Sequence, residues 1–370
     1  MTKTPSRPSR ICYLALDMPH RGQASFIHVN EMVENLRKRG RQIDVYAPTP
    51  GVGARRPPIM VRLLGQARAA ARLIARLGDY DAIYVRAHFL AWPVTLAARR
   101  RGLVILQEVN GPPADVVVSN PWLRPFARLI GWMYRSQYRR SDHVLPVTSE
   151  LAASLRRDGL ERPITVVPNA ANTDLFRPIA RVPATPFVVF IGGLTLWHGT
   201  DLMVQAVRDP AWPSGVELVV IGSGAKQDEI AAAERSGAPL RWLGYRPNGE
   251  IPELISGALA GLSPNTNPSG RSSTGVLPLK LYETLACGIP AIVTDLPGQA
   301  DLVRSAQCGM VIAPDAAALA QAVAYLHANV DEARAMGARG AELVKTAHSW
   351  AARAADVDAV LTMHLRSRAD

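Results

Sequence analysis

The segment PLKLYETLACGIPAIVT, residues 278–294, places a helix directly before a buried strand. Pro278 suits the first turn of a helix and Gly288 suits the position just past its end. The apolar run after Pro290 is short enough for a strand that is covered on both faces. A helix that leads at once into such a strand is typical of a parallel sheet, so the segment predicts an α/β fold.

The same alternation of strands and helices extends to both ends of the chain. We expect a helix over Ser25–Arg39, closed by Gly40, and a Pro-containing joint at Arg177–Pro186. Strands are expected before the joint at Arg10–Leu16, Gln42–Tyr46, Ala82–Val85, Val104–Glu108, Val144–Val147 and Ile164–Val167, and after it at Phe187–Ile191, Glu217–Ile221, Leu240–Leu243, Ala260–Ser263 and Ala291–Thr294.

These patterns predict two Rossmann-like, doubly wound domains, over residues 1–180 and 181–350, whose strand ends meet at a shared cleft. A C-terminal helix over about 351–370 is expected to pack back on the first domain. A chain of 370 residues is long enough for two cores of ordinary size.

Composition excludes several classes of protein. The three cysteines, Cys12, Cys287 and Cys308, lie far apart and form no CxxC pair, so no metal site or disulfide framework is expected. The run Ile11–Leu16 is too short for a signal peptide, and no stretch reaches the roughly 18 apolar residues of a membrane span. No G-x-S-x-G and no P-loop sequence is present. We therefore expect a cytoplasmic protein that is neither a serine hydrolase nor a P-loop kinase.

Positive charge is concentrated in the first half of the chain. Residues 1–180 carry 27 Lys and Arg against 13 Asp and Glu, a net charge of +14, whereas residues 181–370 carry 15 against 18, a net charge of −3. Such an asymmetry favours an anionic partner that meets the N-terminal half. The alternative is that arginine simply occupies solvated faces.

Lys280 and Glu283 are three residues apart in the predicted helix and therefore share a face. A helix N-terminus binds anions through its free N–H groups and its dipole, and Lys280 adds a full positive charge. Such a face could hold a diphosphate through Lys280 and a ribose diol through the carboxylate of Glu283. An ordinary surface Lys–Glu pair is the alternative.

The segment ETLACGIPAI, residues 283–292, resembles the signature helix of the retaining glycosyltransferases of group 1, or family 4, which have the GT-B fold. LPLKLYE, residues 277–283, looks like one branch of that family. Further segments resemble family motifs in the family's order: SDHV at 141–144, TSE at 148–150, VVPNAANTDLFRP at 166–178, FIGGL at 190–194 and WHG at 197–199. The resemblance covers nearly the whole chain.

The resemblance implies a metal-independent hexosyltransferase that uses a UDP- or GDP-linked sugar. It suggests Lys280, Asn110 and Arg271 as catalytic residues. The candidate residues for binding the nucleotide sugar are Glu283, Gly192, Gly193, Gly22, Arg21, Tyr245, Arg246, Pro278 and Leu279.

This sequence departs from the family pattern at several positions. Gly275 stands where most members have a first glutamate, and Gly193 and His198 stand where the common pattern has arginine and lysine. Asn110 replaces a frequent histidine; its amide can still bond a hydroxyl, but it does not titrate. A catalytically degenerate binding subunit is therefore the alternative function.

Cleft-side roles on the N-terminal domain have structural alternatives. Arg86 could line the cleft or form a structural salt bridge, and Glu108 could be a buried residue that fixes the loop after it. Gly192-Gly193, which follows a strand, could leave backbone N–H groups free for a phosphate or form an ordinary turn.

Two arginine-rich segments, Ile59–Leu77 and Trp122–Arg140, combine basic and apolar residues. Helices of this kind can lie on an anionic membrane, which would suit a lipid-linked or glycan acceptor in the biosynthesis of cell-surface polysaccharides. The alternative is that the aromatic residues face the core and the arginines face water. Nucleic-acid binding is not expected, because no recognised module accompanies the charge.

Overall fold

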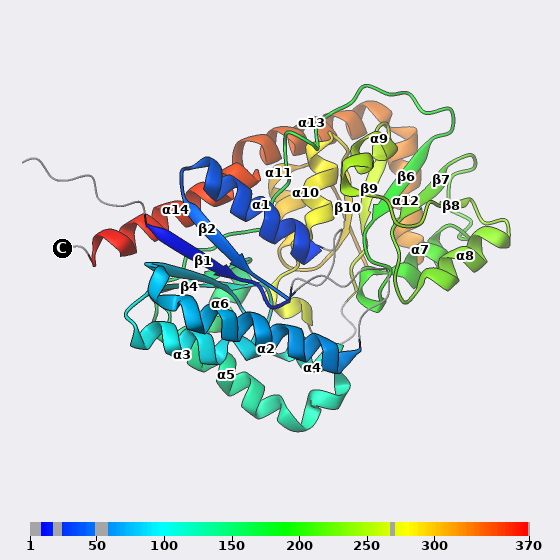
Figure 1. Ribbon diagram of the computed structural model, residues 1–370. Coiled ribbons are helices and arrows are strands. Elements are labelled where there is room, and N and C mark those ends of the chain that lie inside the picture. The colour runs from blue at the N-terminus through cyan, green and yellow to red at the C-terminus, as the bar shows by residue number, and fades with distance from the viewer. Residues whose placement is uncertain (1–8, 18–23, 49–57, 267–270, 369–370) are drawn as a thin grey trace, which may run out of the picture. The chain divides into compact units, whose positions relative to one another are not determined.

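The computed structural model describes residues 9–17, 24–48, 58–266 and 271–368 (Figure 1). The chain forms two units, Met1–Pro168 with Trp350–Asp370, and Asn169–Ser349. This division lies after Pro168, whereas the boundary expected from the sequence lies after residue 180. The reason is local: Asn169 Nδ2 donates to the carbonyl of Leu277, and the backbone of Ala171 bonds to that of His348.

In the described part of unit 1, five parallel strands form a sheet in the order β2-β1-β3-β4-β5. The strands are β1 Arg10–Leu14, β2 Gln42–Tyr46, β3 Ala82–Arg86, β4 Val104–Val109 and β5 His143–Pro146. Strands β3 and β4 are buried at every position, as expected for strands covered on both faces. The order reverses between β1 and β3, and such a switch point is where doubly wound sheets bind ligands.

Helices cover both faces of this sheet. Helices α1 and α14 lie together on one side, and α2, α3 and α5 lie on the other (Figure 1). The helical elements of unit 1 are α1 Ala24–Lys38, α2 Ile59–Arg76, η1 Leu77–Asp79, η2 Phe89–Ala91, α3 Trp92–Arg100, α4 Ala114–Ser119, η3 Pro121–Phe126, α5 Ala127–Arg140, α6 Ser149–Arg157 and α14 Trp350–Arg366.

Helix α14 belongs to unit 1 because it makes apolar and polar contacts there. Its first residue, Trp350, is buried and meets the ring of His28 edge-on, with ring centres 4.8 Å apart. Farther along the helix, Asp358 accepts hydrogen bonds from Arg39 and Arg41. These contacts attach the C-terminal helix to α1 and to the turn after it.

In the described part of unit 2, six parallel strands form a sheet in the order β11-β10-β9-β6-β7-β8. They are β6 Phe187–Ile191, β7 Glu217–Ile221, β8 Leu240–Trp242, β9 Ala260–Ser263, β10 Ala291–Thr294 and β11 Gly309–Ile312. The order reverses between β6 and β9, which puts the switch point of this sheet at the ends of those two strands.

Unit 2 also carries helices on both faces of its sheet. Helices α7, α8 and α12 pack against one face, and α9, α10 and α13 pack against the other. The helical elements are η4 Leu196–His198, α7 Thr200–Ala206, α8 Gln227–Arg235, η5 Asn248–Glu250, α9 Ile251–Ile255, η6 Arg271–Thr274, α10 Leu279–Ala286, α11 Gln299–Ala306, α12 Ala316–Ala328 and α13 Val330–Ala347.

One expected strand was wrong, and one observed strand was not expected. The segment Ile164–Val167 forms only an isolated bridge, between Ile164 and Val144, although the N–H groups of Thr165 and Val167 bond to carbonyls of β5. The ladder is incomplete because Pro146 of β5 has no N–H group to donate back. Strand β11 was not predicted, since its four residues are mostly half-buried and give no long apolar run. The predicted two-domain, parallel-sheet architecture is confirmed.

Candidate active site

Helix α10 carries the strongest sequence signal and is buried along its whole length. It begins after Pro278, which has an extended conformation, and Gly288 lies just past its end with φ +75°. The side chains of Lys280 and Glu283 are buried with the rest, since the two residues are only 8% and 7% exposed. An exposed surface pair, the alternative reading of these two residues, is therefore excluded.

The ammonium group of Lys280 lies against apolar and backbone atoms. Its Nζ is 3.8 Å from the ring centre of Phe190, at the end of β6. A β-carbon added to Gly192 would lie 3.4 Å from Nζ, so a side chain there would press on the ammonium. Within the described residues, Nζ has no hydrogen-bond partner.

This environment changes the protonation of Lys280. Burial disfavours the charged form and lowers the pKa of Lys280 to about 7, although the negative charge of Glu283 opposes the shift. A buried ammonium without a hydrogen-bonding partner is unfavourable, and the face of an aromatic ring stabilises a cation only modestly. An anion beside α10 would therefore stabilise the charged form of Lys280.

Gly192, directly after β6, packs against the loop that follows β7. The N–H of Gly192 donates to the carbonyl of Ile221 over 2.9 Å, so it is not free to bind a phosphate. Gly222, at φ +144°, approaches Gly192 so closely that a β-carbon there would lie 1.9 Å from the Gly192 oxygen. Glycine is thus required where the loops after β6 and β7 touch, and at Gly192 the structure favours the ordinary turn over a free N–H group.

His198 and Gly199 shape the loop after Gly193. His198 Nδ1 lies 2.5 Å from the carbonyl oxygen of Gly193 and 3.1 Å from Thr195 Oγ1. Gly199 has φ +68°, and a β-carbon there would lie 2.0 Å from the carbonyl oxygen of Pro264, just after β9. The WHG sequence therefore contacts the segments that follow β6 and β9, at the switch point of the sheet.

A buried polar network, not anticipated from the sequence, supports the same edge of the sheet. Gln299, the first residue of α11, donates to the carbonyl and hydroxyl of Thr294 and accepts from Ser263 and Asn265. All four residues are buried. The sequence signal was available: Ser263 and Thr294 each end an apolar strand, where a polar residue stands close to the loop edge.

The other predicted site residues of unit 2 lie on loops or at the start of η6. Tyr245 and Arg246 are exposed, after the turn at Gly244 whose carbonyl accepts from the N–H of Gly222. Gly275 has φ +79°, in the left-handed region where a glutamate would be strained. Arg271 begins η6, but its side chain lies outside the described part of the structure.

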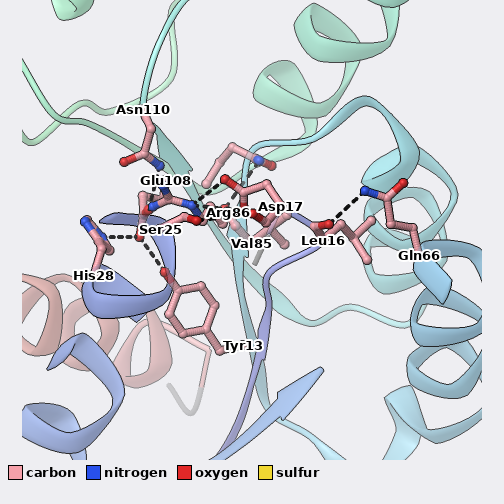
Figure 2. Close-up of polar contacts among 11 residues, drawn as sticks. Tyr13, Leu16, Asp17, Ser25, His28, Gln66, Val85, Arg86, Glu108 and Asn110 are labelled. Carbon is pink, nitrogen blue, oxygen red and sulfur yellow. Dashed lines mark hydrogen bonds and ion pairs between the residues drawn. The ribbon is translucent and has the colours of Figure 1, made fainter. Parts of the chain in front are cut away.

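In unit 1 a buried carboxylate, Glu108, collects polar side chains at the carboxyl ends of β1, β3 and β4 (Figure 2). Tyr13 Oη donates to Glu108 Oε2 over 2.7 Å, and His28 Nε2 lies 3.1 Å from the same oxygen. Arg86 Nη1 and Asn110 Nδ2 donate to the other oxygen, the latter over 2.6 Å.

Electrostatics keep the carboxylate of Glu108 charged. Burial alone would raise the pKa of Glu108, but His28 and Arg86 hold it well below its usual value. Arg86 is also paired with Asp17, through Nε contacts of 2.8 and 3.0 Å to the two carboxylate oxygens. Arg86 therefore forms a structural ion pair, and Glu108 fixes the loop that begins at Asn110. Arg21 and Gly22 lie outside the described residues.

A further surface of unit 1 carries exposed apolar side chains among arginines. On η3 and α5, Trp122, Phe126 and Trp132 are 52%, 53% and 47% exposed. The same stretch exposes Arg124, Arg128 and Arg135, whereas Tyr134 and Tyr138 face the core. The reading in which the aromatic residues of this segment all face the core was wrong.

Two family models match the chain, one over each half. Residues 26–175 match the model described as "Glycosyltransferase Family 4", and residues 185–329 match "Glycosyl transferases group 1". Among curated proteins, the chain is 26% identical to an alpha-maltose-1-phosphate synthase of Mycolicibacterium smegmatis, over 88% of this chain and 91% of that protein. It is 25% identical to a phosphatidyl-myo-inositol mannosyltransferase of Mycobacterium leprae, over 95% of each.

Solved structures share the fold across nearly the whole chain. A sucrose-phosphate synthase from Thermosynechococcus elongatus superposes with a TM-score of 0.78 at 20% identity, covering 97% of this chain and 100% of that one. The Anabaena protein HepE in complex with UDP-glucose superposes with a TM-score of 0.69 at 16% identity, covering 96% of this chain and 100% of that one. In the described parts of the chain, no helix combines the length and apolar character needed to cross a bilayer.

Proposed function

Because the chain belongs to the group 1 and family 4 glycosyltransferases, with their GT-B fold, we propose that it transfers a hexosyl unit from a nucleoside diphosphate sugar to a hydroxyl of a glycan or lipid-linked acceptor. The bond from the anomeric carbon to the phosphate oxygen breaks, and a bond from that carbon to the acceptor oxygen forms. The acceptor's proton leaves to a diphosphate oxygen. We propose retention of configuration and no requirement for a metal ion.

The observation that carries this proposal is the buried ammonium of Lys280 at the N-terminal end of α10. Within the described residues, it has no hydrogen-bond partner. A diphosphate beside it would gain a charge-assisted hydrogen bond and the favourable end of the helix dipole. The charge that develops on the leaving diphosphate makes the same contacts more valuable in the transition state. Neighbouring structures in complex with UDP and with UDP-glucose support this class of donor.

Other residues take supporting roles in the proposal. Glu283, one turn along the same helix, would accept hydrogen bonds from the ribose diol, and Asn110 of unit 1 would contact a hydroxyl of the transferred sugar. Arg271, Arg21 and Gly22 remain candidates for the phosphates, and exposed Tyr245 and Arg246 remain candidates for the base.

The rival proposal is a degenerate binding subunit, which the glycine at position 275 favours. Transfer assays with UDP- and GDP-sugars and a panel of hydroxyl acceptors decide between them. We expect product from the wild type and a loss of roughly 100-fold in kcat/KM for Lys280→Met, as for removal of one transition-state donor. Lys226→Met is the matched control, because Lys226 pairs with Asp201 and Glu229 on the surface of the same unit. Nucleotide binding without any product would instead support the subunit.

We also propose that unit 1 rests on an anionic membrane through the surface of η3 and α5. Trp122, Phe126, Leu129 and Trp132 would insert at the depth of the headgroups, while the neighbouring arginines meet anionic lipids. Exposed Met60, Val61 and Leu64 at the start of α2 add apolar area in the same unit. This location suits the synthesis of cell-surface polysaccharide from a lipid-linked acceptor.

Flotation with vesicles tests the membrane proposal. Vesicles of phosphatidylcholine with phosphatidylglycerol should carry the protein, and vesicles of phosphatidylcholine alone should carry much less. The triple change Trp122→Ser, Phe126→Ser and Trp132→Ser should abolish flotation. Met363→Ser and Tyr325→Ser, which alter exposed apolar residues elsewhere, should leave it intact. Failure of the wild type to float with either vesicle would remove the proposal.

A further inference from the structure

The carboxylate of Glu108 is saturated by donors of two kinds (Figure 2). Oxygen Oε2 faces a ring nitrogen of His28 and the hydroxyl of Tyr13, which can donate or accept a hydrogen bond. Oxygen Oε1 faces the guanidinium of Arg86 and the amide nitrogen of Asn110, which can only donate. The two sides of the carboxylate therefore respond differently to a change at position 108.

This arrangement fixes which way the amide of Asn110 points. If the amide were turned over, its carbonyl oxygen would lie about where its nitrogen now sits, 2.6 Å from a carboxylate oxygen. Two oxygen acceptors at that distance repel, and the carboxylate is ionised because its pKa is well below the usual value. Arg86 cannot release its side of the carboxylate easily, since it is itself held by Asp17.

We infer that Glu108 is a positioning residue: it commits the amide nitrogen of Asn110, so that Asn110 presents its carbonyl oxygen as an acceptor to a hydroxyl of the sugar substrate. The inference rests on the role of Asn110 in the proposed function. It goes further in naming the direction of that hydrogen bond and the residue that sets it. Figure 2 shows the amide nitrogen turned toward Glu108 and the oxygen turned away.

A double-mutant cycle between positions 108 and 110 tests the inference, with kcat and KM measured for transfer. Asn110→Ala should lower kcat/KM roughly tenfold, the value of a hydrogen bond of about 1.4 kcal/mol. Glu108→Ala should cause a loss of similar size, and the double variant should be no worse than either single one. Glu108→Gln should retain most activity, because the hydroxyl of Tyr13 can accept from the new amide while the remaining oxygen serves Arg86 and Asn110.

A second pair of variants covers the case in which Glu108→Ala fails to fold. Asn110→Asp puts two carboxylates in contact and should lose more activity at neutral pH than Asn110→Ala. Adding Glu108→Gln removes one of the charges and should restore part of the loss. A merely structural Glu108 predicts that activity only follows Tm in these variants, so a recovery of Tm without a recovery of kcat/KM would overturn the inference.

The outcomes separate the inference from the proposed function. If Asn110→Ala transfers sugar at the wild-type rate, the proposed role of Asn110 fails and the inference fails with it. If Asn110→Ala is impaired but the effects of the two single changes multiply, Asn110 keeps its role and only the positioning by Glu108 is overturned.

Discussion

The ammonium nitrogen of Lys280 lies 3.8 Å from the ring centre of Phe190. This contact joins the first turn of α10 to the carboxyl end of β6, two elements that are distant in sequence and adjacent in unit 2. It buries the lysine beside a glycine loop and a helix N-terminus. Burial, which the ring contact only partly offsets, explains why the lysine loses its proton more readily than a solvated one.

Binding of UDP should therefore weaken as the pH rises above about 7. In the free protein, Lys280 is mostly neutral above its pKa of about 7. A bound diphosphate favours the charged form, so binding takes up a proton there. The dissociation constant should rise by up to tenfold per pH unit above pH 7 and should lose this dependence on Lys280 below pH 7. Calorimetric titration between pH 6 and 9 measures both limbs.

Lys280→Arg is the control for this pH dependence, because arginine stays charged throughout the range. Ionisation of the nucleotide's own phosphate affects both proteins equally and cancels in their ratio. If the wild type and Lys280→Arg show the same pH profile above pH 7, Lys280 does not titrate on binding.

The close approach of Gly222 to Gly192 predicts a specific sensitivity to substitution. Gly222→Ala should destabilise the protein by more than Gly215→Ala, with a difference of about 1–3 kcal/mol from overpacking. Both glycines have positive φ, +144° and +78°, but a β-carbon at Gly215 would meet nothing within 4 Å. Thermal unfolding compares the two, and equal shifts in Tm would contradict the packing argument.

Acid should destabilise the protein partly through His143. Burial, with a smaller contribution from His364, lowers the pKa of His143 to about 4. Between pH 4 and 6.5 the unfolded chain therefore binds a proton that the folded protein does not, so the free energy of unfolding falls as the pH falls. This histidine contributes a slope of up to about 1.4 kcal/mol per pH unit. His143→Gln should flatten the dependence measured by urea unfolding, and an unchanged slope would refute the assignment.

Much of the fold could be predicted because parallel strands buried on both faces are near-continuous apolar runs. Phe187–Ile191, Glu217–Ile221, Ala260–Ser263 and Ala291–Thr294 were predicted with the bounds that the structure has. The bounds of the edge strand Gln42–Tyr46 were also predicted, although three of its five residues are exposed. Strand β11 was not predicted because its residues are mostly half-buried and give no long apolar run. The segment after Pro163 was overpredicted because an apolar run does not reveal that only one bridge forms.

The candidate site was predictable where a residue's role depends on its own helix. Lys280 and Glu283 share a face of α10 by spacing alone, and both are buried there. The partners of these residues come from distant segments, so the contact with Phe190 and the use of the Gly192 N–H by Ile221 had no local signal. The same holds for Glu108, whose contacts extend from Tyr13 to Asn110.

The most direct test of the central claim is a thermal-shift screen with UDP, GDP, ADP, CMP, TDP and inorganic pyrophosphate. It is applied to the wild type, Lys280→Met and Glu283→Ala. A ligand at 100 times its dissociation constant stabilises the folded protein by about 2.7 kcal/mol, which gives a measurable rise in Tm. We predict that one nucleoside diphosphate shifts the wild type, that Lys280→Met loses the responses to that nucleotide and to pyrophosphate, and that Glu283→Ala loses only the preference for the nucleotide over pyrophosphate. A nucleotide shift of equal size in the wild type and in Lys280→Met would contradict a diphosphate site at α10.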